Sequence, residues 1–467
     1  MVEFHQANST SYPIIDPMAD WNPMLQHGLE KTASYIIRKN GAYYEAIQGG
    51  GASGAGTIAF GGADNAGPID GTDAAAVFQA AATALATSGG KIFVSKGVYT
   101  ITDTIVLGAG LVIEGESQAD DTTDDGTTLS RTTDAPIFEI TDHRHVWFKH
   151  LCLRGVAKGT GATPLVDLVN TCGNINFEGV TFLLSGGDGV QCNGDSYWIT
   201  FRSCQALNVT GGLINNNFAP FDGGTTYLLE NCVAHFSGYV ADIYGVRTTN
   251  IIGGGCDNLD SFAYKLQLCS GNLLGSDIEG VGEDHAIWLV YGSMNVTGCR
   301  LLECGKLGDT KLPIYLSGEM NCKVSGNHFE STVSQYDIGL AADIENVTIE
   351  DNGLSGALGI VGYNESSTVH CINNRGYQTV AVGRGSTYHG QNLSFPYTLA
   401  GIPNIISLSA TGNGGIAGHH IVVGYDPANV STTVIKVYLY DIDDAGIVWT
   451  PDTCTVTYRV EYKPSET

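Results

Sequence analysis

The spacing of hydrophobic residues changes twice along the chain, near residues 56 and 385. Residues 34–48 (SYIIRKNGAYYEAIQ) contain two apolar runs on either side of Asn40–Gly41. That dipeptide favours a tight β-hairpin because both turn positions tolerate a positive φ. The run GGGASGAG that follows, at 49–56, has the composition of a flexible linker. These features predict a small β appendage over residues 1–56.

The segment 70–117 predicts one helix followed by strands. Ala74–Thr87 is rich in alanine, with apolar residues at helical spacing, and Gly89–Gly90 would end the helix. The sequences KIFVSKGVYTI and GLVIEGE that follow are apolar runs of strand length. We therefore expect a single helix before the chain becomes mainly β.

From about residue 145 the chain repeats with a period of roughly 20–30 residues, which is typical of a solenoid. The repeated hexads are FKHLCL (148–153), FEGVTF (177–182), FRSCQA (201–206), LENCVA (229–234), VTGCRL (296–301), VSGNHF (324–329), IEDNGL (349–354) and CINNRG (371–376). Second strands such as ADIYG, AYKLQ, AIWLV and PIYLS lie between them. The pattern predicts about ten coils stacked in parallel about 4.8 Å apart, with like residues above one another.

A ladder of Cys and Asn is predicted at one position of successive coils. It consists of Cys204, Cys232, Cys256, Cys299, Asn327, Asn352 and Asn374. Inward Asn side chains would satisfy backbone groups of neighbouring coils, and Cys would fill the same small volume as a weak hydrophobe. The cysteines are therefore predicted to be buried, separate thiols with a structural role, rather than redox groups or metal ligands.

Residues 385–467 replace the coil pattern with alternation of apolar and polar residues. The segments HHIVVGYD, TTVIKVYLYDID and TCTVTYRVEYKP are examples. Alternation of period two is typical of strands with one buried face. This part of the chain therefore predicts an antiparallel β-sandwich of about six to eight strands.

Two segments resemble known families. Residues 70–117 resemble the opening of the pectate-lyase-like superfamily of right-handed parallel β-helices, through DGTD, the alanine-rich helix, Gly89–Gly90, the strand KIFVS, GVY and the turn GAG. This resemblance implies an all-β fold, a right-handed parallel β-helix over residues 57–384, with the helix capping its N-terminal end. The run SFPYTLAGIPNIISLSATG is similar to the lectin-like C-terminal domains of phage tail fibres. This similarity implies that residues 385–467 trimerise the protein, bind a glycan, or do both.

The composition excludes some classes of protein. The chain has 48 Asp and Glu against 22 Lys and Arg, and its net charge of −26 opposes a nucleic-acid partner, because phosphate binding needs a basic patch. No apolar run reaches the roughly 18 residues of a membrane helix, so no membrane insertion is expected. The N-terminus lacks the basic and then apolar order of a Sec-type signal peptide. The twelve Cys show no zinc spacing, so no cofactor is expected, and Ca²⁺ is the one ion that the acidic composition would suit.

Four side chains are candidates for binding a polysaccharide. Aligning the second strands places Tyr244, Lys265, Trp288 and Tyr315 at one position of four consecutive coils. Aromatic rings have flat apolar faces and polar edges that suit sugar rings, and a Lys can pair with an acidic sugar. The same residue types are also enriched in protein interfaces, so an ordinary outer face or a trimer contact is the alternative.

Three carboxylates are candidates for catalysis. Glycoside hydrolysis uses two carboxylates about 5–5.5 Å or 6.5–9.5 Å apart, and acids one or two coils apart would have such separations. Asp260, Glu279 and Glu303 follow the ladder position on three successive coils. In a chain of this charge such a cluster also arises by chance. The motif sets of polygalacturonase-like hydrolases are absent, and ITDHRHVWFKH (140–150) only faintly resembles a pectate-lyase segment.

The acidic stretch GSDIEGVGEDHAIWL (275–289) is predicted to be one step of the solenoid rather than a site of its own. Asp277 would be buried on the ladder. Glu283, Asp284 and His285 would lie in a solvated loop. Only Glu279 and Trp288 keep a functional role in this interpretation.

The sequence as a whole favours an extracellular or virion spike of the tailspike type. It would be a homotrimer attached to a virion or tail through its N-terminus, and it would bind, and in one version depolymerise, a cell-surface polysaccharide. A secreted polysaccharide hydrolase or lyase is the second hypothesis. A purely structural extracellular β-helix protein is the third.

Overall fold

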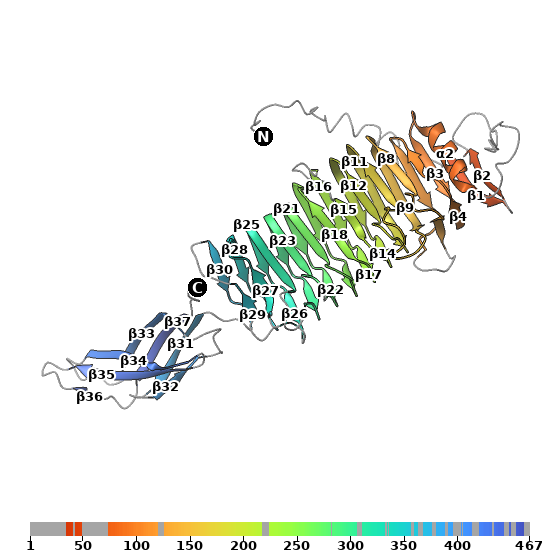
Figure 1. Ribbon diagram of the computed structural model, residues 1–467. Helices are drawn as coiled ribbons and strands as arrows, with labels where there is room; N and C mark the ends of the chain where they lie inside the picture. The colour runs from red at the N-terminus through yellow and green to blue at the C-terminus, as the bar shows by residue number, and fades with distance from the viewer. Residues whose placement is uncertain are drawn as a thin grey trace, which may run out of the picture.

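The structure is a computed structural model. It describes residues 34–48, 73–119 and 126–461, apart from gaps at 41–42, 217–223, 282, 306–310, 332–333, 335, 356–358, 363–367, 376–379, 388–390, 396–402, 404, 413–419, 432–433, 443–447 and 450–453. Most of the described residues form a parallel β-solenoid of about ten coils, and the last strands form a separate antiparallel unit (Figure 1). The prediction of an all-β parallel β-helix with one helix and a C-terminal antiparallel unit is therefore confirmed.

Each coil of the solenoid contributes strands to three parallel sheets, numbered here in the order in which the chain visits them. Sheet 1 contains β3 (Gly90–Val94), β6 (Leu111–Gly115), parts of β9 (Arg144–Arg154) and β11 (Cys172–Leu183), β13 (Ser196–Arg202), β16 (Thr226–Glu230), β19 (Thr248–Ile252), parts of β21 (Tyr264–Leu274), β23 (Ile287–Thr297) and β25 (Ile314–Ser325), β28 (Glu345–Glu350) and β30 (Val369–Ile372). Sheet 2 contains β4 (Gly97–Ile101), β7 (Thr127–Arg131), the ends of β9 and β11, β14 (Gln205–Leu207), β17 (Val233–His235), β20 (Gly255–Asp257), β22 (Asp277–Glu279), β24 (Arg300–Leu302) and β26 (His328–Glu330). Sheet 3 contains β5 (Ile105–Leu107), β8 (Phe138–Thr141), β10 (Val166–Val169), β12 (Val190–Asn193), β15 (Gly212–Asn216), β18 (Tyr239–Tyr244), the starts of β21, β23 and β25, β27 (Tyr336–Leu340) and β29 (Gly359–Val361).

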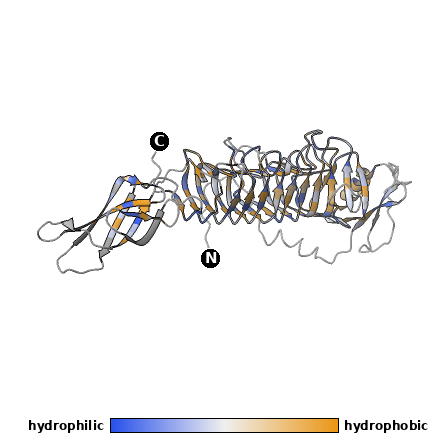
Figure 2. Ribbon diagram, turned by 90° about the horizontal axis from the view of Figure 1, so that it is seen from below, coloured by the Kyte–Doolittle hydropathy of each residue, from blue (hydrophilic) through white to orange (hydrophobic). Residues whose placement is uncertain are grey.

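The core of the solenoid is built from like residues stacked on successive coils. Phe148, Phe177 and Phe201 share one inward position of sheet 1, with ring centroids 5.0 and 4.7 Å apart and nearly parallel planes. Figure 2 shows the resulting alternation of hydrophobic and hydrophilic residues along the strands. Alternating side chains point to opposite faces of a strand, so every second residue is committed to the core and the others form the outer surface.

The N-terminal hairpin and the helix close one end of this core. Strands β1 (Tyr35–Asn40) and β2 (Tyr43–Gln48) form the predicted hairpin, and β1 also pairs in parallel with β3. The hairpin is therefore continuous with sheet 1. Helix α2 (Ala74–Leu85) begins where the Asp73 carboxylate accepts hydrogen bonds from two backbone N–H groups, and its apolar face is buried against the core. Its position agrees with a cap over the first coil.

The predicted ladder runs along the corner between sheets 1 and 2. Asn352 shows how it works, because its side-chain oxygen accepts from the backbone and side-chain N–H groups of Asn327 (both 3.0 Å). Its side-chain nitrogen donates to the carbonyl of Val324 (3.0 Å) and to Oδ1 of Asn374 (2.8 Å). All three Asn are buried. Asn thus joins neighbouring coils through side-chain as well as backbone hydrogen bonds.

Two predictions at this corner are wrong. Cys256 pairs with Ala234, and the ladder position above Cys232 belongs to Gly254. A Cβ at Gly254 would lie 2.0 Å from the carbonyl oxygen of Cys232, and its φ is +74°, so no side chain fits there. Asp277 is exposed and forms an ion pair with an Arg of the next coil, because it lies one residue beyond the ladder position.

Eleven of the twelve cysteines are described as free thiols, and all eleven are buried. Several donate weak hydrogen bonds to the carbonyl two residues earlier, as Cys269 does to Gln267 (3.2 Å). Burial raises the pKa of Cys299 to about 11, so this thiol stays protonated at neutral pH.

The C-terminal unit consists of two antiparallel sheets. One contains β31 (Val380–Thr387), β33 (Ile405–Gly412) and β37 (Cys454–Glu461), and the other contains β32 (Gln391–Ser394), β34 (His420–Val430), β35 (Val434–Ile442) and β36 (Val448–Trp449). Leu393 and Val437 of one sheet share a core with Val456 and Val460 of the other. Strand β31 begins at Val380 and crosses residue 385, so the first strand of this unit starts inside the range predicted for the β-helix.

Candidate functional site

One outward position of sheet 3 carries polar or aromatic residues on eight consecutive coils. These residues, called the outer row here, are Glu139, Asp167, Gln191, Asn215, Asp242, Lys265, Trp288 and Tyr315. All eight are half-buried. Neighbouring coils lie about 4.8 Å apart, so the row presents a regular series of side chains along the solenoid axis.

Three of the four predicted binding residues come together in this row. Lys265 pairs with Trp288, and Trp288 pairs with Tyr315. The alignment of Tyr244 with them is wrong, because Tyr244 lies opposite Gln267, two residues further along its strand. The buried residues set the register between β18 and β21, and there Ala241 lies opposite Tyr264. The sequence alignment did not expect a Tyr at this inward position.

A cation lies between two aromatic rings in the middle of the row. Nζ of Lys265 is 5.0 Å from the ring centroid of Trp288 and 5.9 Å from that of Phe262. It is also 4.0 Å from the carboxylate of Asp242. These contacts hold the Lys side chain across the sheet face by cation–π and charge attraction.

His285 supports the aromatic end of the row. Its ring stacks on Tyr315 with a centroid distance of 4.3 Å and meets Trp288 edge to face at 5.5 Å. Its Nδ1 accepts a hydrogen bond from the backbone N–H of Leu312 (3.0 Å), so the ring proton belongs on Nε2. His285 is only 7% exposed, so its predicted place in a solvated loop is wrong. Nearby, Asp284 forms an ion pair with a lysine (2.9 Å).

A buried carboxylate and a tyrosine lie on the Asn215 side of the Lys265 contacts. Asp188, in the loop before β12, accepts hydrogen bonds on Oδ1 from the Tyr239 hydroxyl (2.6 Å) and from the backbone N–H of Gly212 (2.8 Å). The Tyr239 hydroxyl in turn accepts from Nδ2 of Asn215 (2.8 Å). The Tyr239 ring stacks on Phe262 at 4.9 Å. This network therefore connects the outer row to a carboxylate behind it.

The two carboxylates nearest this network have raised pKa values. Burial raises the pKa of Asp188, and the hydrogen bond from Tyr239 opposes the increase. Burial also raises the pKa of Asp242; the positive charge of Lys265 opposes this, and the negative charge of Asp188 adds to it. Burial and the neighbouring Asp188 raise the pKa of Tyr239. A raised pKa favours the protonated form of a carboxyl group, which is the form that donates a proton in acid catalysis.

The predicted catalytic acids lie elsewhere and do not share a position. Glu279 is on sheet 2, opposite Leu302, so Glu303 is one residue further along its coil. Asp260 lies in the loop that follows β20 and forms an ion pair with Lys158 (2.6 Å). Correcting the ladder at residue 256 removes the spacing that had related Asp260 to Glu303. Their role in catalysis stays a prediction.

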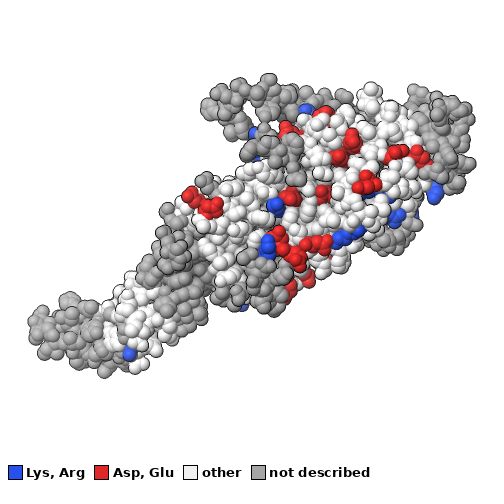
Figure 3. Space-filling model, in the orientation of Figure 1, with Lys and Arg blue, Asp and Glu red and all other residues white. Residues whose placement is uncertain are grey.

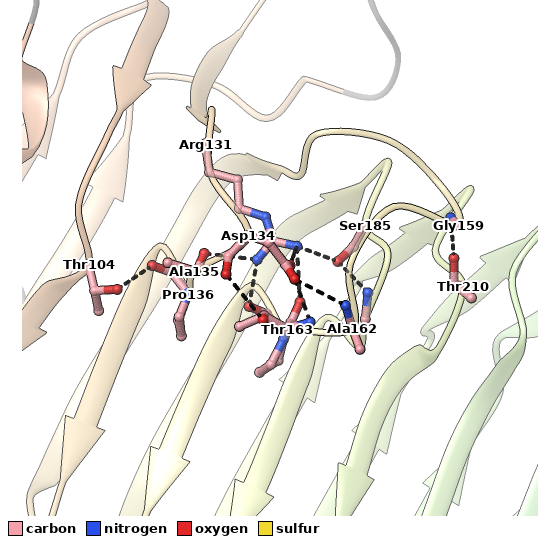
Figure 4. A network of polar contacts seen from close by, with 12 residues as sticks. Thr104, Arg131, Asp134, Ala135, Pro136, Gly159, Ala162, Thr163, Ser185 and Thr210 are labelled. Carbon is pink, nitrogen blue, oxygen red and sulfur yellow. Dashed lines mark hydrogen bonds and ion pairs between the residues drawn. The ribbon is translucent and has the colours of Figure 1, made fainter.

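A buried arginine fixes the loops that precede sheet 3. Arg131, 3% exposed, donates to the carbonyls of Ala135, Thr163 and Pro164 and to Oγ of Ser185, at 2.9–3.3 Å (Figure 4). These partners belong to the loops before β8, β10 and β12. The loop that carries Asp188 is thereby tied to the two loops before it.

Acidic side chains form several groups on one face of the solenoid. Figure 3 shows these Asp and Glu groups between larger areas of uncharged residues, with Lys and Arg in fewer places. Within the described ranges, no group of three or more His, Cys, Asp or Glu could hold a metal ion. None of the helices in that part of the chain is long and apolar enough to cross a membrane.

Comparison with known proteins identifies the fold. No family model and no curated protein sequence matches the chain. The crystal structure of DFA-IIIase from Arthrobacter chlorophenolicus A6 has 12% identity and a TM-score of 0.52 over 65% of this chain and 91% of that chain. The tailspike protein of Acinetobacter phage vB_ApiP_P1 has 13% identity and a TM-score of 0.41 over 94% and 97%. The tailspike of Pseudomonas phage LKA1 has 12% identity and a TM-score of 0.37 over 80% and 68%. At these identities the likeness concerns the fold alone.

Proposed function

Because the chain has the parallel β-helix fold found among phage tailspikes and other proteins, we propose that it binds a cell-surface polysaccharide along the outer row. The observation that carries this proposal is the placement of Lys265, Trp288 and Tyr315 at one position of consecutive coils. A linear glycan lying along the axis would meet a new side chain about every 4.8 Å. The aromatic rings would stack on sugar faces, and Lys265 would contact hydroxyl or acidic groups.

An interface with another subunit is the competing explanation for these aromatic residues. The row favours a polar ligand, because six of its eight members carry carboxylate, amide or ammonium groups and only Trp288 and Tyr315 are aromatic.

Binding can be measured directly with a panel of purified neutral and acidic bacterial capsular polysaccharides. Trp288→Ala should weaken the tightest interaction by roughly thirtyfold, which corresponds to about 2 kcal/mol. Trp147 provides a matched control, because it is a half-buried Trp of sheet 1 with Nζ of Lys149 4.7 Å from its ring centroid. Trp147→Ala should leave the affinity unchanged. Equal losses in both variants, or no binding to any polysaccharide, would contradict the proposal.

The proposal extends to the setting in which the protein works. We place it on a virion surface or outside the cell, as a homotrimer attached through its N-terminal region. The resemblance of the C-terminal run SFPYTLAGIPNIISLSATG to the lectin-like domains of phage tail fibres supports this placement. Light scattering of the full-length protein should give three times the mass of one chain, and a monomeric mass would refute the trimer.

A further inference from the structure

We propose that the same face hydrolyses the bound glycan, with Asp242 as the proton donor and with Tyr239 and Asp188 accepting the proton of the attacking water. This inference rests on the proposed glycan binding and adds a reaction to it. Asp242 would touch the substrate, whereas Asp188 would act through Tyr239.

The position of Asp242 in the outer row supports this role. It lies between Asn215 on the preceding coil and Lys265 on the following one. A glycan stacked on the aromatic end of the row would therefore bring its next unit over Asp242. The Asp242 side chain is 25% exposed, so it can reach a ligand while remaining partly shielded from water.

The hydrogen bonds of Tyr239 and Asp188 supply a route for the proton of the attacking water. Tyr239 donates its hydroxyl proton to Asp188 and accepts from Asn215, and both hydrogen bonds are short and fixed. The ring of Tyr239 is also held by stacking on Phe262. Asp188 is 8% exposed, so it communicates with the surface through Tyr239.

The reaction balances with water as the only co-reactant. Asp242 transfers its proton to the glycosidic oxygen as the bond between that oxygen and C1 breaks. The water oxygen forms a new bond to C1. The water proton passes to the Tyr239 oxygen, and the Tyr239 proton passes to the Asp188 carboxylate. Asp242 later regains a proton from solvent as Asp188 loses one, which restores the starting state.

Electrostatics supports the role of Asp242 as the proton donor. The groups that interact with Asp242 are Asp188, Lys265 and Gln267 on the next coil, and Tyr239 on its own strand. Burial and the charge of Asp188 raise the pKa of Asp242, and Lys265 limits the increase. A proton donor needs such a raised pKa, because its acidic form must be populated at working pH.

A carboxylate on another sheet provides a matched control. Glu178 is a half-buried acid of sheet 1, outside the outer row, and its carboxylate forms an ion pair with Nζ of Lys149 (2.9 Å). Asp242 likewise lies beside a lysine, Lys265. Because Glu178 belongs to a different sheet from the proposed glycan site, its carboxylate has no part in the proposed reaction.

The test measures binding and cleavage separately, using the capsular polysaccharide panel and the full-length protein. Wild type should release reducing ends without absorbance at 235 nm. Asp242→Asn should lower the rate by at least about a hundredfold and change the affinity by less than about threefold. Glu178→Gln should keep the wild-type rate. Tyr239→Phe, which retains the ring but removes the hydroxyl, should also slow cleavage while the affinity changes by less than about threefold.

The outcomes distinguish the two proposals. Binding without new reducing ends would overturn hydrolysis and leave glycan binding intact. Products that absorb at 235 nm would also overturn it, since they indicate elimination. Loss of cleavage in Glu178→Gln but not in Asp242→Asn would reject the assignment of the acid. No binding to any polysaccharide would instead refute the proposed function itself.

Discussion

The Asn ladder offers a sharp test of what holds the coils together. Asn352→Leu keeps the number and branching of the side-chain heavy atoms at a buried position but replaces the amide oxygen and nitrogen by two methyl groups. The substitution deletes four hydrogen bonds to groups of three neighbours, Asn327, Val324 and Asn374. Since these partners are inside the solenoid, they cannot turn to water instead.

The expected cost follows from this count. A buried hydrogen bond contributes about 1 kcal/mol net, so four lost bonds destabilise the local coils by about 4 kcal/mol. In a solenoid each coil contacts mainly its neighbours, so the loss should remain near residues 324–374. A free-energy change of about 4 kcal/mol corresponds to roughly a thousandfold change in the opening equilibrium, at about 1.4 kcal/mol per factor of ten.

Hydrogen exchange followed by mass spectrometry measures this opening coil by coil. Amides of β28 and β30 should exchange roughly a thousandfold faster in Asn352→Leu, while those of β13 and β16 should not change. Cys232→Ala is the control at an equivalent ladder position, where the thiol makes only a weak bond to the Glu230 carbonyl (3.5 Å). It should cost about 1 kcal/mol. An acceleration below about tenfold in Asn352→Leu would refute the view that the amides stabilise the stack.

Two further predictions concern charged residues. Arg131→Met should destabilise the loops before β8, β10 and β12 by about 2–4 kcal/mol, because buried carbonyls such as that of Thr163 lose their hydrogen-bond donor. Hydrogen exchange at residues 155–165 should then be faster than in the wild type. Unchanged exchange would contradict this prediction. Lys265→Met should raise the pKa of Asp242 further, because the opposing positive charge is lost. The cleavage rate falls as pH rises through the pKa of the acid, so this falling limb should move to higher pH at saturating polysaccharide, and a shift to lower pH would refute the role of Asp242.

The sequence predicted the architecture well because the solenoid repeats itself. The period of the hexads, the hairpin around Asn40–Gly41 and the helix that begins at Ala74 are local signals, and each is found in the structure. Where the length of the repeat changes, the alignment of successive coils that was predicted from the sequence is wrong. The two glycines before Gly255 shifted the Cys ladder by two residues, and the buried Tyr264 shifted the alignment of Tyr244.

The candidate site was harder to predict because its parts are far apart in the chain. Asp188 and Tyr239 are 51 residues apart and meet only because they lie two coils apart in the stack, on either side of Gly212. Asp242 was overlooked because Tyr244 was assigned to its place in the row. His285 was expected in a solvated loop, since its burial depends on stacking against Tyr315 of the next coil. Local sequence contains none of these contacts.

The buried thiols have a consequence for where this protein can be made and used. No described cysteine forms a disulfide, and each thiol is enclosed by the stack. These eleven thiols therefore need no oxidant and no disulfide exchange to reach their places in the fold. In a chain assembled in a reducing cytoplasm, these thiols would remain unpaired after release into an oxidising medium. The stability of the stack would therefore be the same in both places.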